Sequence, residues 1–186
     1  MTITKTDIED VVIIEPQLFK DDRGYFFESF SQREYNNIDC CFWAQDNESM
    51  SSYGVVRGLH FQAPPFAQSK IVRCVVGRVL DVAVDIRKGS PTYGQHVKVE
   101  LSEDNHRQLY IPRGFAHGFA VLSDKAIFQY KCGWSKYQPK YDGGINLLDE
   151  SLGIDWGVPA DKMILSEKDK KHPMLKDFVS PFEYQQ

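Results

Sequence analysis

The sequence lacks the features of several large protein classes. Its cysteines, Cys40, Cys41, Cys74 and Cys132, form no CxxC pair, so the spacing of zinc and dithiol redox sites is missing. It has no basic surplus, since 22 Lys and Arg residues accompany 26 Asp and Glu residues. It also has no GxGxxG stretch of the kind that binds dinucleotides. We therefore expect no nucleic-acid partner and four reduced, structural thiols.

Long apolar segments are missing as well. No run approaches the roughly 20 apolar residues of a membrane-spanning helix, and the N-terminal stretch MTITKTDIEDVVII is too acidic for a signal peptide. We therefore expect no membrane partner and a cytoplasmic location. The chain of 186 residues has no repeat or linker and fits one domain. We expect a single domain over residues 1–186, with a C-terminal extension from about residue 153 to 186.

What remains is dominated by patterns typical of strands. Short β-branched or aromatic runs alternate with turn residues at 11–15, 24–30, 70–76, 78–86, 95–101, 108–111, 115–122 and 126–132. Gly77 separates two of these runs, which predicts a hairpin. Helical patterns occur only near residues 31–37 and in the last fifth of the chain. Strands this short predict an all-β antiparallel sandwich or barrel.

One cluster of polar residues lies within residues 57–62, RGLHFQ. Arg57 and His60 flank Leu59 inside a strand-like pattern, where an arginine must pair with an acid or bind an anion. The alternative is a surface arginine beside a hydrogen-bonded core histidine. These residues alone leave both interpretations open.

A second cluster, residues 111–119, contains a PxGxxH pattern similar to the second half of a cupin metal motif. The first half of that motif has the form HxH followed by a glutamate, whereas the chain has His60-Phe61-Gln62 and no glutamate at that spacing. The two histidines, His60 and His117, make a poor ligand set for zinc or iron without a carboxylate. The pattern favours a cupin-like barrel and predicts no metal centre.

Other polar residues have ordinary structural explanations when each is considered alone. Residues 166–170 fit a solvated charge run at a helix start, with Ser166 as the N-cap and Asp169 three residues later. A strand tyrosine such as Tyr130 is more often core than catalyst. The pair Asp46-Asn47 fits a turn. Spacing alone singles out none of them.

In order along the chain, these segments resemble the dTDP-4-dehydrorhamnose 3,5-epimerase family. The matching stretches are residues 22–24, 27–28, 45–47, 57–62, 70–73, 77–87, 112–119, 130–132, 153–156 and 166–169. The combination of RGLHFQ with PRGFAHGF is specific, and the matches cover nearly the whole chain. The resemblance implies a cupin-type jelly-roll β-barrel with short helices, mainly C-terminal. It also implies a homodimer in which an N-terminal strand segment is exchanged.

The resemblance implies an isomerase that uses no cofactor. Its substrate is a dTDP-linked 4-keto-6-deoxyhexose, inverted at C3 and C5 from dTDP-4-dehydro-6-deoxyglucose to dTDP-4-dehydrorhamnose. A proton beside the ketone is removed to form an enolate and is returned to the opposite face. By position, His60 resembles the base, Tyr130 the acid and Asp169 the carboxylate that orients His60. Asp81 is expected to add to this network.

The same resemblance implies a set of substrate contacts. Nucleotide and phosphate contacts, some reaching across the dimer, are matched by Arg23, Glu28, Gln45, Asp46 and Asn47. Arg57 and Lys70 correspond to groups near the pyrophosphate or the enolate oxygen. Further ligand positions are matched by His117, Asp142 and Lys168.

The chain departs from the family pattern after Tyr130-Lys131-Cys132. It continues Gly-Trp-Ser-Lys-Tyr, one residue longer than the family's Thr-Asp/Asn-Tyr-Tyr. We assign stacking on the nucleotide base to Tyr137, with Trp134 as the competitor, which leaves the base preference open.

The sequence leaves four other functions to be weighed. Two are enzymes on a related NDP-4-keto sugar, namely a 3-epimerase and a keto-isomerase. The other two are a metal-dependent cupin oxygenase and a non-catalytic sugar-nucleotide-binding cupin. The missing metal ligands weigh against the oxygenase. The presence of His60, Tyr130 and Asp169 weighs against the non-catalytic protein.

Overall fold

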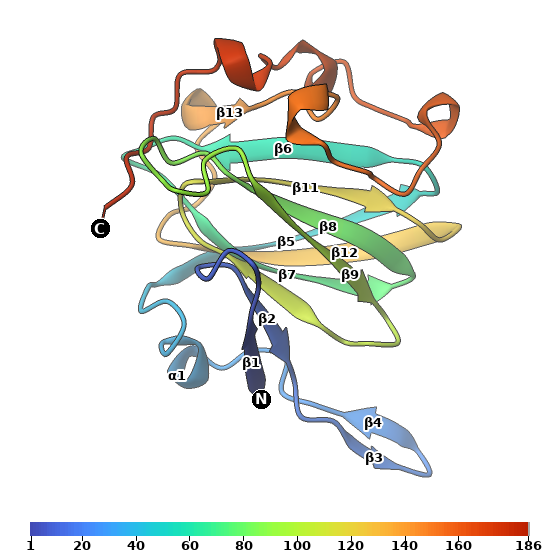
Figure 1. The fold of residues 1–186 in the computed structure, drawn as a ribbon. Coiled ribbons are helices and arrows are strands. Elements are labelled where there is room, and N and C mark those ends of the chain that lie inside the picture. The colour runs from blue at the N-terminus through green and yellow to red at the C-terminus, as the bar shows by residue number, and fades with distance from the viewer. Residues whose placement is uncertain (186) are drawn as a thin grey trace.

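Two antiparallel β-sheets packed face to face form the body of the molecule (Figure 1), seen in a computed structural model that describes residues 1–185. The six-stranded sheet has the order β1 (Thr2–Lys5), β2 (Val12–Glu15), β10 (Gln108–Ile111), β7 (Ser69–Val76), β12 (Lys125–Gly133) and β5 (Trp43–Ser52). The five-stranded sheet has the order β13 (Asp142–Gly144), β6 (Val56–Gln62), β11 (Phe115–Val121), β8 (Arg78–Asp85) and β9 (His96–Ser102). The predicted all-β jelly roll is confirmed.

The remaining elements are short. Strands β3 (Phe19–Asp21) and β4 (Gly24–Phe26) form a hairpin arm that projects from the body (Figure 1). The α-helix α1 (Gln32–Tyr35) follows the arm, and the 3-10 helices are η1 (Pro139–Tyr141), η2 (Glu150–Leu152), η3 (Ala160–Lys162), η4 (Asp169–Lys171) and η5 (Leu175–Asp177). Among residues 1–185, no helix is long and apolar enough to cross a membrane.

Side chains alternate along each strand, so each sheet has two faces. The faces that meet between the sheets contribute Val72, Leu109, Phe119 and Phe128 to one buried cluster. The outer face of the five-stranded sheet is also buried, because the C-terminal segment lies across it (Figure 1). That segment brings residues such as Trp156 against Val82, Val84 and Ile86 of β8 and its end. Strand β8 is therefore buried on both faces, and its aspartates Asp81 and Asp85 are fully buried too.

The predicted hairpin at Gly77 is wrong. Strands β7 and β8 belong to different sheets, so the chain passes from one sheet to the other at this glycine. Gly77 has φ 78°, and a Cβ there would lie 2.1 Å from the carbonyl oxygen of Lys125. Only glycine fits this crossing, which a sequence pattern cannot distinguish from a hairpin turn. Two further expectations change: only residues 24–26 of the predicted strand 24–30 form a strand, and Asp46-Asn47 lies inside β5.

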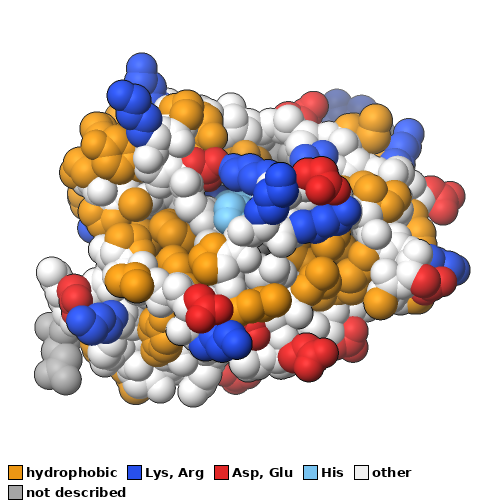
Figure 2. Space-filling model, turned by 90° about the horizontal axis from the view of Figure 1, so that it is seen from above, with side chains coloured by type: hydrophobic (Ala, Val, Ile, Leu, Met, Phe, Trp, Pro, Cys, Tyr) orange, Lys and Arg blue, Asp and Glu red, His pale blue; other side chains and the backbone are white. Residues whose placement is uncertain are grey.

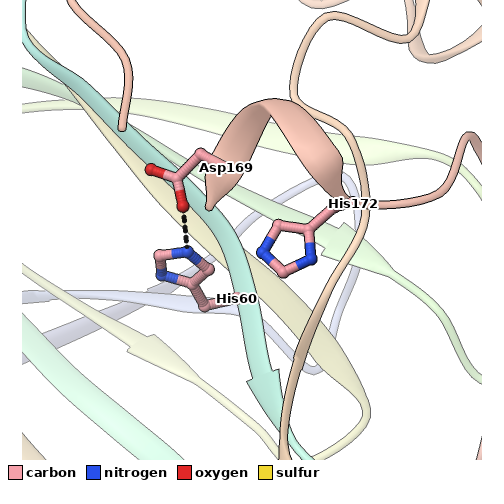
Figure 3. A group of neighbouring side chains, drawn as sticks. All are labelled: His60, Asp169 and His172. Atoms are coloured by element: carbon pink, nitrogen blue, oxygen red, sulfur yellow. Dashed lines mark hydrogen bonds and ion pairs between the residues drawn. The ribbon is translucent and has the colours of Figure 1, made fainter. Parts of the chain in front are cut away.

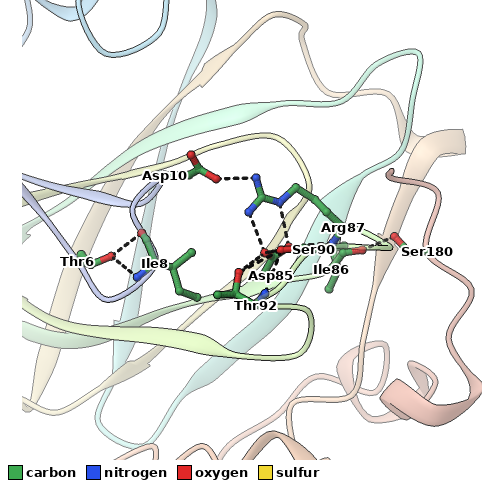
Figure 4. A network of polar contacts seen from close by, with 9 residues as sticks. All are labelled: Thr6, Ile8, Asp10, Asp85, Ile86, Arg87, Ser90, Thr92 and Ser180. Carbon is green, nitrogen blue, oxygen red and sulfur yellow. Dashed lines mark hydrogen bonds and ion pairs between the residues drawn. The ribbon is translucent and has the colours of Figure 1, made fainter. Parts of the chain in front are cut away.

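A buried ion pair ties the two chain ends to the end of β8 (Figure 4). Asp85 accepts hydrogen bonds from the Arg87 backbone and guanidinium, from Ser90 and from Thr92, at 2.6–3.0 Å. Arg87 also binds Asp10 at 2.7 Å and stacks on the ring of Tyr184. Burial would raise the pKa of Asp85, but these hydrogen bonds outweigh it and lower the pKa overall.

We expect Asp85→Asn to lower the free energy of unfolding by about 3–5 kcal/mol at neutral pH, because Arg87 then lacks its buried carboxylate. The pKa of Asp85 is lowered in the folded state. Its contribution is therefore present above the unfolded pKa of about 3.9 and is lost as pH falls through the folded value. The gap between the two proteins should shrink below about pH 4. Urea unfolding followed by tryptophan fluorescence over a pH series measures this gap.

Asp104→Asn is the matched control, since Asp104 is exposed. It should change the free energy of unfolding by less than about 0.5 kcal/mol. If Asp85→Asn lowers the free energy of unfolding by the same amount at neutral and at acid pH, the proposed dependence on the ionisation of Asp85 is wrong.

Candidate active site

A cavity of about 310 Å³ lies between the two sheets at one end of the sandwich. It is lined by Gln45, Asn47, His60, Phe61, Gln62, Gln68, Lys70, Tyr130, Cys132, Tyr137, Asp142 and Lys168. Figure 2 views the molecule from the side of the C-terminal segment and shows a histidine in a hollow bordered by basic and acidic side chains. The lining thus combines titratable groups from both sheets in one solvent-accessible space.

Two glycines position His60 on β6. In the pairing of β6 with β11, His60 faces His117, and the register shifts between His117 and Phe119. A Cβ on Gly58, which has φ 129°, would lie 2.6 Å from the Cα of Gly118. The glycines of the RGLH and HGF stretches therefore allow the two backbones to approach closely where the histidines emerge.

His60 and Asp169 form a hydrogen-bonded dyad (Figure 3). The His60 Nε2 atom lies 2.6 Å from Asp169 Oδ1, and the two side chains are 31% and 4% exposed. Burial would raise the pKa of Asp169, but the hydrogen bond and charge of His60 outweigh it and lower the pKa. A carboxylate only accepts hydrogen bonds, so Nε2 donates and Nδ1 keeps its lone pair when the ring is neutral. The dyad leaves His60 with one basic nitrogen that is not bound to Asp169.

The C-terminal segment supplies the carboxylate of the dyad. Asp169 begins the 3-10 helix η4, and its backbone N–H donates to the Ser166 hydroxyl at 3.1 Å. Residues 166–170 are thus not simply a solvated charge run, because Asp169 is buried against β6.

Tyr130 and Lys70 face the cavity from the opposite sheet. Tyr130 lies on β12 and Lys70 on the neighbouring β7, with the Lys70 ammonium 5.7 Å from the centre of the tyrosine ring. Burial raises the pKa of Tyr130, so the phenol stays protonated and can donate. Burial lowers the pKa of Lys70, which makes the ammonium a readier proton donor. An imidazole on one sheet therefore faces a phenol and an ammonium on the other.

Hydrogen bonds organise the mouth of the cavity. The Tyr137 hydroxyl donates to Asp142 at 3.0 Å, and Lys168 forms an ion pair with the same carboxylate. The Tyr137 backbone N–H donates to Gln45, whose amide donates to Asn47. Tyr137 is 49% exposed, so about half of its surface remains accessible at the mouth.

Trp134, the competitor of Tyr137, points elsewhere. Its indole N–H donates to Asp39 at 3.0 Å, and the Arg113 guanidinium lies 3.9 Å from its ring centre. It is not among the residues that line the cavity.

Five of the expected substrate contacts do not line this cavity within one chain. Asp46 lies on the outer face of β5 and pairs with Lys131, in a separate groove of about 320 Å³. His117 is buried and binds Asp81 at 2.9 Å, so the carboxylate expected beside His60 pairs with another histidine, while Arg57 binds the Ser51 hydroxyl. The other two belong to the arm and the segment after it, Arg23 and Glu28.

The sequence analysis missed His172, which lies beside the dyad (Figure 3). Its ring centre is 5.6 Å from that of His60. Burial, followed by the charge of His60, lowers the pKa of His172. The D-x-x-H spacing of Asp169 and His172 was the available signal, because residues i and i+3 share one side of a 3-10 helix. Gln62 and Cys132 also line the cavity and were not assigned a role.

Comparison with known proteins identifies the family. A family model described as dTDP-4-dehydrorhamnose 3,5-epimerase matches residues 5–177. The dTDP-4-dehydrorhamnose 3,5-epimerase of Escherichia coli K12 is 52% identical over 181 residues, 96% of this chain and 97% of the relative. The Legionella pneumophila dTDP-6-deoxy-D-glucose-3,5-epimerase, in complex with dTDP-4-keto-L-rhamnose, has a TM-score of 0.94 and 44% identity and covers 100% of this chain and 99% of its own. A Streptomyces bikiniensis 3'-monoepimerase, in complex with dTDP-quinovose, has a TM-score of 0.84 and 34% identity over 92% and 87% of the two chains. The chain belongs to the dTDP-4-dehydrorhamnose 3,5-epimerase family.

Proposed function

We propose that this enzyme inverts C3 and C5 of dTDP-4-dehydro-6-deoxyglucose to give dTDP-4-dehydrorhamnose. The observation that carries the proposal is the pair of His60 and Tyr130, which project from opposite sheets into one cavity. An epimerase needs this arrangement, because the proton leaves one face of the carbon and returns to the other. The reaction involves no net oxidation, so we expect it to need no cofactor.

In the proposed first step, His60 Nδ1 removes the proton from the carbon beside the ketone. Imidazole suits this role because its basicity matches neutral pH. Asp169 holds the ring in one tautomer through Nε2 and stabilises the imidazolium that forms. The electron pair of the broken C–H bond moves to the ketone oxygen and gives an enolate.

Lys70 and Tyr130 complete the proposed step. The Lys70 ammonium stabilises the enolate oxygen, because a fixed positive charge in the cavity lies where negative charge develops. Tyr130 donates its proton to the opposite face of the carbon and restores the ketone. His60 then gives its proton to water and Tyr130 takes one from water, after which the same step at the second carbon completes the double inversion.

The remaining lining residues suit the nucleotide end of the substrate. We propose that the base stacks on Tyr137, which is held in place by Asp142 and Gln45. Lys168 and Asn47 offer a cation and an amide for the diphosphate and sugar. For Arg57, Asp46 and His117, which do not line the cavity here, a contact with substrate requires movement or a second subunit.

Inversion at C3 alone is the second candidate function, because a 3'-monoepimerase with 34% identity shares the fold over most of both chains. Deuterium incorporation separates the two functions. In deuterium oxide, an enzyme that works at both carbons labels C3 and C5 of the sugar, whereas a monoepimerase labels C3.

The location of the enzyme is proposed from its thiols. In the described part of the chain, residues 1–185, none of the four cysteines forms a disulfide. This agrees with a reducing compartment and supports the cytoplasm as the place of action.

We expect His60→Ala to abolish deuterium uptake at both carbons of dTDP-4-keto-6-deoxyglucose, because no other group replaces the base. Tyr130→Phe should retain some exchange but lose inversion, since the enolate forms and is not protonated from the other side. Proton NMR in deuterium oxide measures both. Full deuterium exchange in His60→Ala would show that His60 is not the base. Normal turnover in Tyr130→Phe would show that Tyr130 is not the acid.

Asp169→Asn tests the dyad. An amide carries no charge to stabilise the imidazolium, so kcat should fall by about 10²–10⁴-fold, with a smaller change in KM. Asp177→Asn, which changes an exposed carboxylate eight residues further on, should leave both constants unchanged. Parent-like kcat in Asp169→Asn would show that the carboxylate does not assist His60.

We also propose that one domain spans the chain and that two copies form a homodimer through the arm. The arm exposes Phe19, Tyr25 and Phe26, the last to 70%. A two-stranded hairpin is at best marginally stable alone in water, so it needs a covering surface. Strand β5 is a free sheet edge that a second copy can approach. In such a dimer, Arg23 at the arm's turn would reach the cavity of the partner.

Phe26→Glu should convert the dimer to a monomer in sedimentation velocity, since it places a charge in the covered patch. Leu148→Glu is the control, because Leu148 is 47% exposed and lies outside the arm. A monomeric parent at micromolar concentration would refute the homodimer.

A further inference from the structure

His172 completes a group of three metal-ligating side chains behind the cavity. One ligand atom from each of His60, Asp169 and His172 lies within 4.8 Å of the other two. Figure 3 shows the His172 ring directed toward the dyad. The His172 Nε2 atom is buried and has no hydrogen-bond partner among residues 1–185. Leaving a buried ring nitrogen without a hydrogen-bond partner costs free energy. The His172 Nε2 atom is therefore suited to bind a ligand placed between it and the dyad.

The local structure holds the three groups on one side. Asp169 and His172 lie three residues apart across η4, so their side chains emerge on the same face. His60 approaches from β6, where Gly144 of β13 is its register partner. A Cβ on Gly144 would lie 2.6 Å from His172 Nε2, so only glycine leaves room for the imidazole.

We propose that His60, Asp169 and His172 bind one divalent transition-metal ion, of which Zn²⁺ is the best match, and that this ion inhibits the enzyme. Two imidazoles and one carboxylate with an open fourth position form a common protein zinc site. Ligand atoms around a tetrahedral zinc lie about 3.4 Å apart, given bond lengths near 2.1 Å. In the structure, the ligand atoms of His60 and Asp169 are 2.6 Å apart, and no two of the three ligand atoms are more than 4.8 Å apart. The zinc value lies within this range. Hard ions such as Mg²⁺, which prefer oxygen ligands, fit poorly.

The metal would inhibit the enzyme because it changes which nitrogen of His60 carries the proton. A metal bound at His60 Nε2 takes the lone pair of that nitrogen, and the ring proton moves to Nδ1. Nδ1 is the atom proposed to accept the substrate proton, so the metallated ring is no longer a base. The metal also displaces the hydrogen bond from His60 to Asp169. This inhibitory effect rests on the proposed role of His60, whereas metal binding does not.

The test compares the purified parent protein with His172→Gln and with the control His96→Gln. His96 lies on β9, at the opposite edge of the five-stranded sheet from β13. Zn²⁺ binding is measured by titration calorimetry after chelator treatment. Inhibition by Zn²⁺ is expressed relative to each protein's own activity in excess chelator, so a change in basal rate cancels. Circular dichroism melting checks the fold of each protein, and His172→Ala is a second variant.

We expect one Zn²⁺ per chain for the parent and for His96→Gln, with inhibition that chelator reverses. His172→Gln should bind at least about tenfold more weakly, since even outer-shell changes weaken metal sites by 10–100-fold. The site is overturned if His172→Gln binds Zn²⁺ as tightly as the parent does. It is also overturned if His96→Gln loses as much affinity as His172→Gln, or if the parent shows no saturable binding. Binding without inhibition overturns the inhibitory effect alone. If the epimerase activity is absent, calorimetry still decides the metal site.

Discussion

The hydrogen bond between His60 and Asp169 is the interaction on which the site depends. It joins a strand near the chain's first third to a 3-10 helix near its end. The backbone of Ile164 pairs with Gly54 and Val56, which attaches the C-terminal segment to the start of β6. Gly54 is needed there, since a Cβ would lie 2.3 Å from the carbonyl oxygen of Lys162. The C-terminal segment therefore both covers the outer face of a sheet and delivers the carboxylate.

The two-sheet architecture explains how the groups face one another. Strand alternation turns His60 inward from one sheet and Lys70 and Tyr130 inward from the other. Enclosure changes the properties of these groups, because burial raises the pKa of the phenol and lowers that of the ammonium. The same enclosure brings His172 close to the dyad, and we infer that this makes the base sensitive to a divalent transition-metal ion such as Zn²⁺.

Particular residues show where sequence patterns reach their limit. Strand positions such as 108–111 follow from β-branched and aromatic composition, and the structure has the same bounds. The Gly77 hairpin failed because a glycine between two strand runs is equally compatible with a passage between sheets. Trp134 and Tyr137 could not be separated by spacing, since their directions depend on Asp39 and Asp142, which lie elsewhere in the chain.

The sequence by itself determined the all-β class, the family resemblance and the residue types available for proton transfer, because these depend on local composition and ordered motifs. Tertiary structure decided which of those residues share a cavity, because pairing across sheets joins positions far apart in the chain. It separated Asp46 and His117 from the cavity lining and placed His172 beside His60. It also determined the burial of Asp169 and placed His60 beside it, and the hydrogen bond from His60 lowers the pKa of that carboxyl.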